Sequence, residues 1–394
     1  MGRKSKTTNT KLIHSGEIND QYGSLVTPIY QTSTFKFPTA EEGAARFLGD
    51  SEGYIYTRLA NPTIDTLEKK LADLEQGDGC IAVASGMAAV TTTYAALLSQ
   101  GDHIISSKSV YGSSRESMEQ IFSRFGIMAT YVDTSVQENI EAAARPETRL
   151  IYLESPSNPN LVVSDIEQIS SFAHQHNLLV AVDNTFCSPY IQQPLVLGAD
   201  IVIHSLTKFI SGHADVIGGC IVSANANLDQ KLRKAMIYMG CTMDPHQAFL
   251  VERGVKTLGL RMERAQENAL KISRFLSDHD AVAWVTYPGL ENFPQKQLVE
   301  RQMSGHGAMI SFGLHGGYEA GKKLMDEVRL IKLAVSLGGV ESLIQHPASM
   351  SHVVLSAQAR AEAGINDDLI RLSVGVEDTE DLLTDLDSAL TNIH

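Results

Sequence analysis

Two charged side chains stand just after apolar, strand-like runs of the sequence. Asp183 follows the run 178–182, and Lys208 comes shortly after the run 201–203. A lysine forms a Schiff base with an aldehyde, and a carboxylate keeps a pyridine nitrogen protonated so that the ring can take up electrons. The pair therefore indicates a pyridoxal phosphate (PLP) site in which Lys208 bonds the aldehyde and Asp183 faces the ring nitrogen.

Groups suited to the phosphate of this cofactor lie close to the same runs. Ser205 and Thr207 carry hydroxyls, and Gly86 and Met87 open a predicted helix behind the apolar run 80–84. The first backbone N–H groups of a helix have no partner within the helix and bind phosphate well. We therefore predict that these hydroxyls and amides hold the phosphate.

Each of these residues also has an ordinary structural explanation. A lysine such as Lys208 can be a solvated strand end, Asp183 can begin a turn, and Ser85 can cap a helix. What favours the cofactor site is the combination of these residue types on successive strand ends.

The surrounding sequence predicts an alternation of strands and helices. Asn61 and Pro62 are typical of a helix start, and apolar residues then recur at helical spacing. Strands that alternate with helices indicate βαβ units and a mainly parallel sheet, in which ligands bind at the carboxyl ends of the strands. The predicted strands of this region are 80–84, 104–106, 150–153, 178–182, 201–203 and 219–222, with a helix opening at Ser164.

The pattern changes near Asp244-Pro245, where a long helix or helix pair begins and continues to about residue 280. Strand-like runs follow at 308–314, 330–335 and 370–374, before a closing helix at 381–390. This change separates a smaller C-terminal domain from the larger one. We predict an irregular N-terminal arm (1–50), a large PLP-binding α/β domain (51–250) and a C-terminal α+β domain (251–394).

The composition argues against several classes of partner. The 394 residues carry a formal net charge of −14, which repels nucleic acid. No apolar run approaches the roughly 18 residues of a membrane span, and the basic first residues lack the apolar segment of a signal peptide. The four cysteines form no CxxC pair, and no histidine spacing suggests a metal. We therefore expect a cytoplasmic protein that acts on a small molecule, with no nucleic acid, membrane or metal partner.

Several longer segments resemble the PLP enzymes of cysteine and methionine metabolism. This is the family of cystathionine γ-synthase, cystathionine γ-lyase, methionine γ-lyase and O-acetylhomoserine sulfhydrylase. The resemblance extends from TPIYQTSTF (27–35) to IRLSVGVED (370–378). Its densest stretches are GYIYTRLANPT (53–63), ASGMAA (84–89), DNTFCSPY (183–190), HSLTKFISGHADVIGG (204–219) and SLGGVESLIQHPASMSH (336–352).

This resemblance implies the fold of PLP-dependent transferases of fold type I, and it implies roles for further residues. Tyr111 matches the tyrosine that stacks on the cofactor ring and assists departure of the γ-substituent. Asn158 matches a residue near the ring hydroxyl. Ser336 and Arg371 match the binders of the substrate α-carboxylate, a task for which a planar guanidinium is well suited. The implied reaction is elimination or replacement of a γ-substituent of an amino acid.

The resemblance also implies an oligomer. Tyr56 and Arg58 match residues that reach the phosphate of a neighbouring subunit's cofactor. Active sites would then be shared between two subunits, which requires at least a dimer, and the family is usually tetrameric.

Val335 bears on the substrate. Relatives that handle cystathionine carry glutamate directly before SLGG, whereas the methionine γ-lyases carry valine, as this chain does. An apolar side chain there favours an uncharged thioether. The resemblance therefore implies conversion of L-methionine to methanethiol, 2-oxobutanoate and ammonia.

Other positions keep alternative substrates open. The methionine γ-lyases carry cysteine where this chain has Ser113, and a Lys-Asp pair where it has Met236-Ile237. Glu116 stands where cystathionine γ-lyases carry arginine, and it is either a solvated helix charge or the anionic mouth of a pocket. The alternatives are cystathionine, O-acetylhomoserine with a thiol, and an oxygen-linked cationic substrate such as canavanine.

Overall fold

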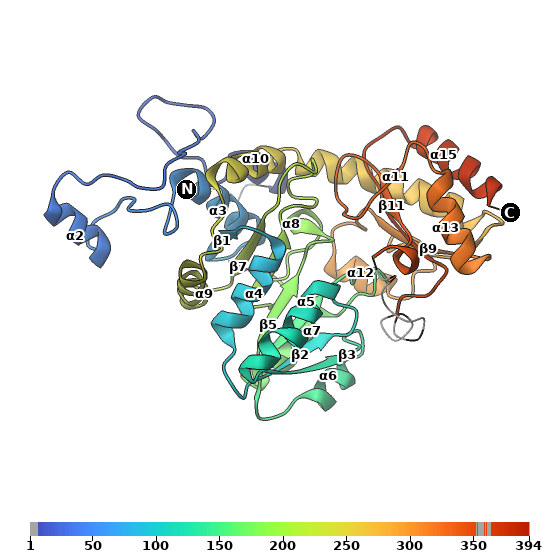
Figure 1. The fold of residues 1–394 in the computed structure, drawn as a ribbon, viewed down its shortest axis with the longest axis horizontal. Helices are drawn as coiled ribbons and strands as arrows, with labels where there is room; N and C mark the ends of the chain where they lie inside the picture. Colours follow the sequence, from blue (N-terminus) through green and yellow to red (C-terminus); the bar gives the residue numbers. More distant parts are fainter. Residues whose placement is uncertain (1–6, 352, 354–357, 359, 361–363, 394) are drawn as a thin grey trace.

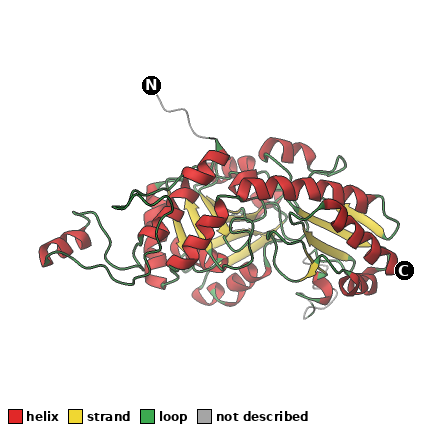
Figure 2. Cartoon of the chain, turned by 90° about the horizontal axis from the view of Figure 1, so that it is seen from above, coloured by secondary structure: helices red, strands yellow, loops and turns green. Residues whose placement is uncertain are grey.

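A computed structural model describes residues 7–351, 353, 358, 360 and 364–393. Two β-sheets lie side by side, and the helices α10 and α11 pass along the top of both (Figure 1). An N-terminal segment carrying α2 projects from the end nearest the first sheet, in Figure 1 and in the view from above (Figure 2). His352, the last residue of the segment 336–352 singled out in the sequence, lies outside the described residues.

The larger sheet has seven strands in the order β1-β7-β6-β5-β4-β2-β3. The strands from β6 to β3 run parallel, while β7 is antiparallel to both β1 and β6. The predicted mainly parallel α/β sheet is therefore confirmed. Its strands are β1 (Gly79–Val83), β2 (His103–Ser107), β3 (Met128–Val132), β4 (Thr148–Glu154), β5 (Leu179–Asp183), β6 (Ile201–Ser205) and β7 (Gly219–Ser223).

The central strands of this sheet are buried because helices cover both faces. In β6 the side chains of Ile201, Val202 and Ile203 are fully buried. A sheet covered on both sides gives continuous apolar runs, which explains why these strands were visible in the sequence. The helices of this part are α3 (Pro62–Glu75), α4 (Gly86–Leu97), α5 (Gly112–Gln120), α6 (Gln137–Ala143), α7 (Ile166–Gln175), α8 (Ser188–Ile191) and α9 (Ala226–Met239), with the 3-10 turn η1 (Phe122–Phe125).

The smaller sheet has five strands in the order β10-β11-β12-β9-β8. The predicted helix region after residue 244 is a pair of helices, α10 and α11. The strands are β8 (Val282–Thr286), β9 (Met309–Leu314), β10 (Lys332–Leu333), β11 (Leu343–Gln345) and β12 (Leu369–Ser373). The helices are α10 (Pro245–Val255), α11 (Leu258–Ser277), α12 (Lys296–Gln302), α13 (Gly317–Glu327) and α15 (Thr379–Asn392), with the 3-10 turn η2 (Pro347–Ser349).

Two local predictions were wrong in detail. The N-terminal arm is not simply irregular, because it contains α1 (Thr8–His14) and α2 (Ala40–Leu48). Thr39 caps α2 by accepting the N–H of Glu42, a threonine-to-glutamate spacing that the sequence already displayed. The predicted helix start at Ser164 falls one residue later, since Asp165 is the capping residue of α7.

The predicted strand 330–335 is only two residues long, Lys332–Leu333. It ends early because Ser336 has φ +103°, a left-handed conformation that side chains other than glycine rarely adopt. The chain therefore leaves the sheet just where it turns toward Lys208. This strained residue belongs to the candidate site.

Candidate functional site

The carboxyl ends of four strands of the larger sheet lie along one edge. Asp183 ends β5, Ser205 ends β6 and Glu154 ends β4, and the chain beyond β1 enters α4 at Gly86. Since β1, β6, β5 and β4 all run in the same direction, these residues gather at the edge where ligands bind in open α/β sheets.

A chain of hydrogen bonds joins this edge to the smaller sheet. The Nζ of Lys208 donates to the Oγ of Ser336 at 2.8 Å. The guanidinium of Arg371 donates to the backbone carbonyl of Ser336 at 2.7 Å and to Oδ1 of Asn158 at 3.0 Å. Residues far apart in the sequence thus surround one point between the two sheets.

Lys208 lies in a partly dehydrated environment next to a second cation. Burial first, and then the charge of Arg371, lower the pKa of the Lys208 ammonium to about 8. A lysine with a lowered pKa is more often neutral near pH 7, which is the form that attacks an aldehyde.

Arg371 is buried in β12 and only 6 % exposed. Its Nε–H has no hydrogen-bond partner, and within the described ranges no carboxylate forms an ion pair with it. Burial lowers the pKa of its guanidinium to about 10. A buried cation that retains an unused donor is suited to an anion supplied by a ligand.

Asp183 presents the complementary situation. Its carboxylate accepts the N–H of Thr185 at 3.1 Å and the hydroxyl of Tyr152 at 3.4 Å. Burial raises the pKa of this carboxyl, and among the described side chains no cation lies within ion-pair distance of it. A protonated ring nitrogen would supply the missing positive charge.

The predicted phosphate groups lie close together at the start of α4. Ser85 caps the helix by accepting the N–H of Ala88, which leaves the amides of Gly86 and Met87 available. A Cβ on Gly86 would lie 3.0 Å from that of Ser205, so the glycine lets the two segments approach. Thr207 completes the group, with its hydroxyl held by the N–H of Gly218 at 3.0 Å.

These observations fit PLP. The structure provides a lysine with a lowered pKa, a buried carboxylate without a cation, and a helix N-terminus with free amides beside two hydroxyls. The three groups occupy one edge of one sheet, and each has the chemistry that one part of the cofactor needs.

Tyr111 and Asn158 depend on a residue that was missed in the sequence. Glu154 is 5 % exposed, and its carboxylate accepts the backbone N–H of Tyr111 at 2.7 Å and that of Asn158 at 2.9 Å. The signal was present, because Glu154 follows the apolar run 150–153 as Asp183 follows 178–182. Thr185 and Tyr152, which hold Asp183, were also missed.

Three residues predicted to contact the substrate side chain are at least partly exposed and adjoin segments of the site in the sequence. Val335 is 60 % exposed and precedes the strained Ser336. Ser113 is half-buried in the first turn of α5, and Glu116 is exposed on the same helix. The carboxylate of Glu116 forms no ion pair within the part of the chain that the structure describes.

Tyr56 and Arg58 lie away from these groups, at the base of the projecting arm. Both are exposed, the guanidinium of Arg58 lies over the Tyr56 ring at 5.7 Å, and it donates to the carbonyl of Ile237 at 2.9 Å. The structure of one chain therefore does not bring them to Lys208.

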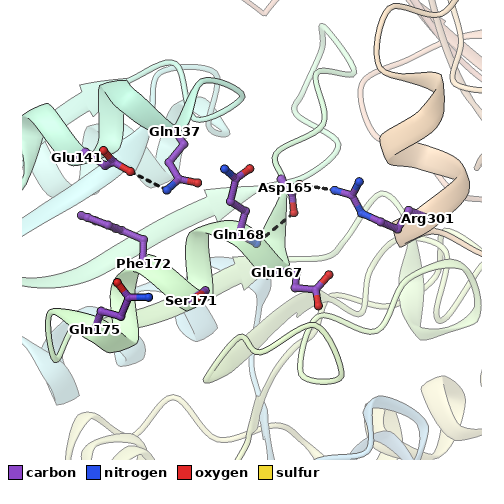
Figure 3. A pocket seen from close by; sticks show the side chains of 9 residues that line it. All are labelled: Gln137, Glu141, Asp165, Glu167, Gln168, Ser171, Phe172, Gln175 and Arg301. Carbon is purple, nitrogen blue, oxygen red and sulfur yellow. Dashed lines mark hydrogen bonds and ion pairs between the residues drawn. The ribbon is translucent and has the colours of Figure 1, made fainter.

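A separate hollow of about 440 Å³ lies between α6, α7 and α12 (Figure 3). Its wall is polar and includes the ion pair between Asp165 and Arg301. None of the predicted site residues lines it, so volume alone does not mark the functional site of this chain. The described residues contain no cluster of three or more metal-ligand side chains. They also contain no helix long and apolar enough to cross a membrane.

Comparison with known proteins agrees with this geometry. Residues 9–391 match the model of a family described as Cys/Met metabolism PLP-dependent enzymes. The L-methionine γ-lyase of Treponema denticola is 48 % identical over 98 % of this chain and 96 % of its own. The cystathionine γ-lyase of Bacillus subtilis is 45 % identical over 98 % of this chain and 99 % of its own. The solved structure of cystathionine γ-lyase from Lactobacillus plantarum, in complex with L-serine, has a TM-score of 0.93 at 41 % identity and covers 98 % of this chain and 99 % of its own.

The fold is that of a PLP-dependent enzyme of fold type I. The chain belongs to the family of PLP-dependent enzymes of cysteine and methionine metabolism, and its cofactor is pyridoxal 5'-phosphate. Within that family it is a carbon–sulfur lyase.

Proposed function

We propose that this enzyme eliminates the γ-substituent of L-methionine, giving methanethiol, 2-oxobutanoate and ammonia. The observation that carries the proposal is the junction of Lys208, Ser336 and Arg371, which places an amine beside a buried cation with an unused N–H. That junction suits an amino acid held by its carboxylate with its α-carbon near the lysine. The similarity to several L-methionine γ-lyases supports the same substrate.

In this proposal Lys208 bonds the cofactor, and Asp183 balances the charge of the ring nitrogen. The phosphate is held by the hydroxyls of Ser205 and Thr207 and by the backbone amides of Gly86 and Met87. When bound, PLP supplies an electron sink that makes the α-proton of an amino acid acidic. All other steps are assigned to groups of the protein.

Arg371 binds the substrate carboxylate with its free Nε–H and an adjacent donor, and Asn158 restrains the guanidinium through Oδ1. Lys208 would act as the base that removes the α-proton of the substrate and then moves a proton from its β-carbon. Its low pKa, about 8, supports this role because the amine must be neutral to accept a proton.

Tyr111 is proposed as the general acid for the departing sulfur. It lies at the start of α5, is 47 % exposed, and its backbone N–H is bound by Glu154 at the end of β4. A phenol at this place can donate a proton to a thiolate leaving group as the carbon–sulfur bond breaks. Water then completes the release of 2-oxobutanoate and ammonia.

The preference for an uncharged substrate rests on Val335. Its exposed side chain next to Ser336 offers the tail of the substrate an apolar contact, without a carboxylate that would attract a second ammonium group. Ser113 follows Tyr111 by two residues in the sequence and is proposed to contact the same tail. Methionine satisfies such a surface better than cystathionine does.

One observation supports a second candidate. Glu116 is exposed on α5, the helix that begins directly after Tyr111, and no described side chain neutralises it. An anionic group at the entrance suits a cationic tail, such as the guanidinooxy group of canavanine. O-acetylhomoserine with a thiol, and cystathionine, are the other substrates to compare.

We also propose that the enzyme works as a homo-oligomer, with Tyr56 and Arg58 reaching the phosphate in a second copy of the chain. Support comes from their exposure and from the apolar side chains of the arm, including Leu25 at 91 % and Tyr22 at 83 % exposed. A tetramer built from two such pairs is the proposed state. A cytoplasmic location is supported by the four free cysteines.

A panel assay tests the substrate proposal. The PLP-loaded enzyme is given methionine, homocysteine, cystathionine, O-acetylhomoserine and canavanine, each with and without added thiol. Formation of 2-oxobutanoate is measured, with a separate homoserine assay for canavanine. Fastest turnover of methionine without thiol supports the proposal, and preference for a cationic substrate contradicts it in favour of the second candidate. Glu116→Gln should then raise KM for the cationic substrate alone.

A further inference from the structure

Glu154 connects two loops that both carry predicted site residues. It ends β4, and its two carboxylate oxygens accept one backbone N–H each, from Tyr111 in the loop after β2 and from Asn158 in the loop after β4. Both contacts are short, at 2.7 and 2.9 Å. The side chain therefore acts as a bridge between the two loops.

Keeping a carboxylate at this position is unfavourable without a specific reason. Glu154 is 5 % exposed, and no described cation forms an ion pair with it. It pairs in register with Asp183, a second buried acid. Burial, and then the charge of Asp183, raise the pKa of the Glu154 carboxyl, while the two N–H groups and Arg371 oppose this change. An isolated buried charge is costly, so its retention indicates that its geometry is used.

Tyr111 is the residue whose position depends most on this bridge. The residue is 47 % exposed and its phenol forms no hydrogen bond with a described residue, so the contacts that hold Tyr111 in place are those of its backbone. The Tyr111 carbonyl accepts the N–H groups of Ser114 and Arg115 in the first turn of α5. Its own N–H points the other way, to Glu154. The backbone of Tyr111 is thus held from both sides.

We infer that Glu154 is a positioning residue for Tyr111, holding its backbone so that the phenol lies where the γ-substituent leaves. The second carboxylate oxygen of Glu154 is fixed by the hydrogen bond that it accepts from the backbone N–H of Asn158. Glu154 itself touches neither the substrate nor the cofactor. The inference rests on the proposed role of Tyr111 as the acid for the leaving group. A misplaced acid slows bond cleavage but leaves removal of the α-proton by Lys208 intact.

The first experiment needs no cofactor. Hydrogen exchange of the backbone amides is measured by mass spectrometry on the cofactor-free chain, in the peptide that contains the Tyr111 N–H. Glu154→Gln offers one carbonyl oxygen where the wild type has two acceptors. We expect faster exchange in the peptide containing Tyr111. Glu68→Gln is the matched control, because Glu68 is also a buried acid that accepts a backbone N–H, that of Ala82.

The second experiment separates two steps of catalysis. L-norleucine has a methylene in place of the methionine sulfur and no leaving group, so exchange of its α-proton in D₂O reports Lys208 alone. In Glu154→Gln we expect kcat for methionine elimination to fall about 10- to 30-fold, and norleucine exchange to change less than about 2-fold. Glu68→Gln should leave the ratio of the two rates unchanged.

A double-mutant cycle with Tyr111→Phe decides whether Glu154 acts through Tyr111. In the Tyr111→Phe background, adding Glu154→Gln should lower elimination by no more than about 2-fold. A full loss in that background overturns the inference, as does an equal fall in elimination and exchange. Glu154→Asp keeps the charge but is shorter, and it should show the same selective loss if Glu154→Gln does not fold. Failure of wild-type elimination, or an unaltered rate in Tyr111→Phe alone, would instead contradict the proposed function.

Discussion

The strand-end site and the segment 17–60, which runs from the arm through Tyr56 and Arg58, both carry predicted cofactor residues, yet they are built in opposite ways. At the strand ends, Lys208, Ser336, Arg371 and Asn158 are joined by hydrogen bonds within one chain. In the arm, Gly43 is the one buried residue among 17–60, all of which the structure describes. Figures 1 and 2 show α2 extending well beyond the rest of the chain.

This difference separates what one chain completes from what it offers to another. The strand-end groups have their neighbours in place, because the core of two sheets fixes the backbone that carries them. The segment 17–60 has a defined local structure, in which the Arg58 guanidinium donates a hydrogen bond to the Ile237 carbonyl. Several of its apolar side chains nevertheless face solvent. Exposed apolar surface of this kind marks an interaction site.

Lys208→Ala should remove the chemistry of the strand-end site. We expect 2-oxobutanoate formation to fall at least about 1000-fold, since no other described lysine lies at this junction and both bonding to the cofactor and proton transfer depend on the amine. Activity and the visible absorbance of the bound cofactor are measured together. Lys322→Ala, an exposed position on α13, is the control. Retention of even a tenth of the activity would contradict the role of Lys208.

Arg371→Lys tests the carboxylate site while preserving the charge. A lysine lacks the planar set of donors that reach Ser336 and Asn158 and leave one N–H free. We expect KM for methionine to rise about 30- to 100-fold with a smaller change in kcat, measured by steady-state kinetics. If kcat falls and KM is unchanged, Arg371 does not bind the substrate carboxylate.

Arg58→Ala addresses the arm. We expect about a 10-fold loss of activity at limiting cofactor, because a cation near the phosphate is removed in the neighbouring site. Mixing this variant with Lys208→Ala should then restore about a quarter of the wild-type activity, since half of random pairs are mixed and each mixed pair has one intact site.

A control chain that carries both Arg58→Ala and Lys208→Ala should stay inactive, because every site in its pairs lacks Lys208. Wild-type-like activity of Arg58→Ala, or an absence of recovery on mixing, would show that the arm does not complete a neighbour's site. The strand-end site would then be sufficient by itself.

The pKa of Lys208 gives the smallest effect. With a pKa near 8 instead of 10.5, about one-tenth of the amine is neutral at pH 7, compared with about three in ten thousand for an ordinary lysine. The rate of cofactor uptake by the cofactor-free enzyme should therefore rise with pH up to about 8 and then level off. Stopped-flow absorbance measures this rate. A rise that continues to pH 10 would mean that the environment does not lower the pKa.

Most strands of the larger sheet could be predicted from the sequence, because strands that are buried on both faces form continuous apolar runs. It did not display β3 or β8, whose side chains are mostly half-buried and alternate less clearly. It predicted too long a strand at 330–335, since the turn at Ser336 serves the site and departs from local preference. The role of Glu154 could not be predicted for a similar reason. A glutamate at the end of a strand is common, and its hydrogen bonds to Tyr111 and Asn158 depend on how the two loops fold.

The class of fold and the cofactor could be predicted from the sequence because they depend on residue types at strand ends and helix starts, which are local. The family was indicated by the resemblance of longer segments. Which of the site residues contact one another could be seen only in the folded structure. It joined Lys208 to Ser336 and Ser336 to Arg371, and it left the buried Arg371 Nε–H without a hydrogen-bond partner. It also left the Asp183 carboxylate without an ion pair to a described cation, and it brought the Glu154 carboxylate to the backbone N–H of Tyr111. These contacts link β4, β6, β12 and two loops that lie far apart along the chain. The packing of the two sheets alone sets their distances.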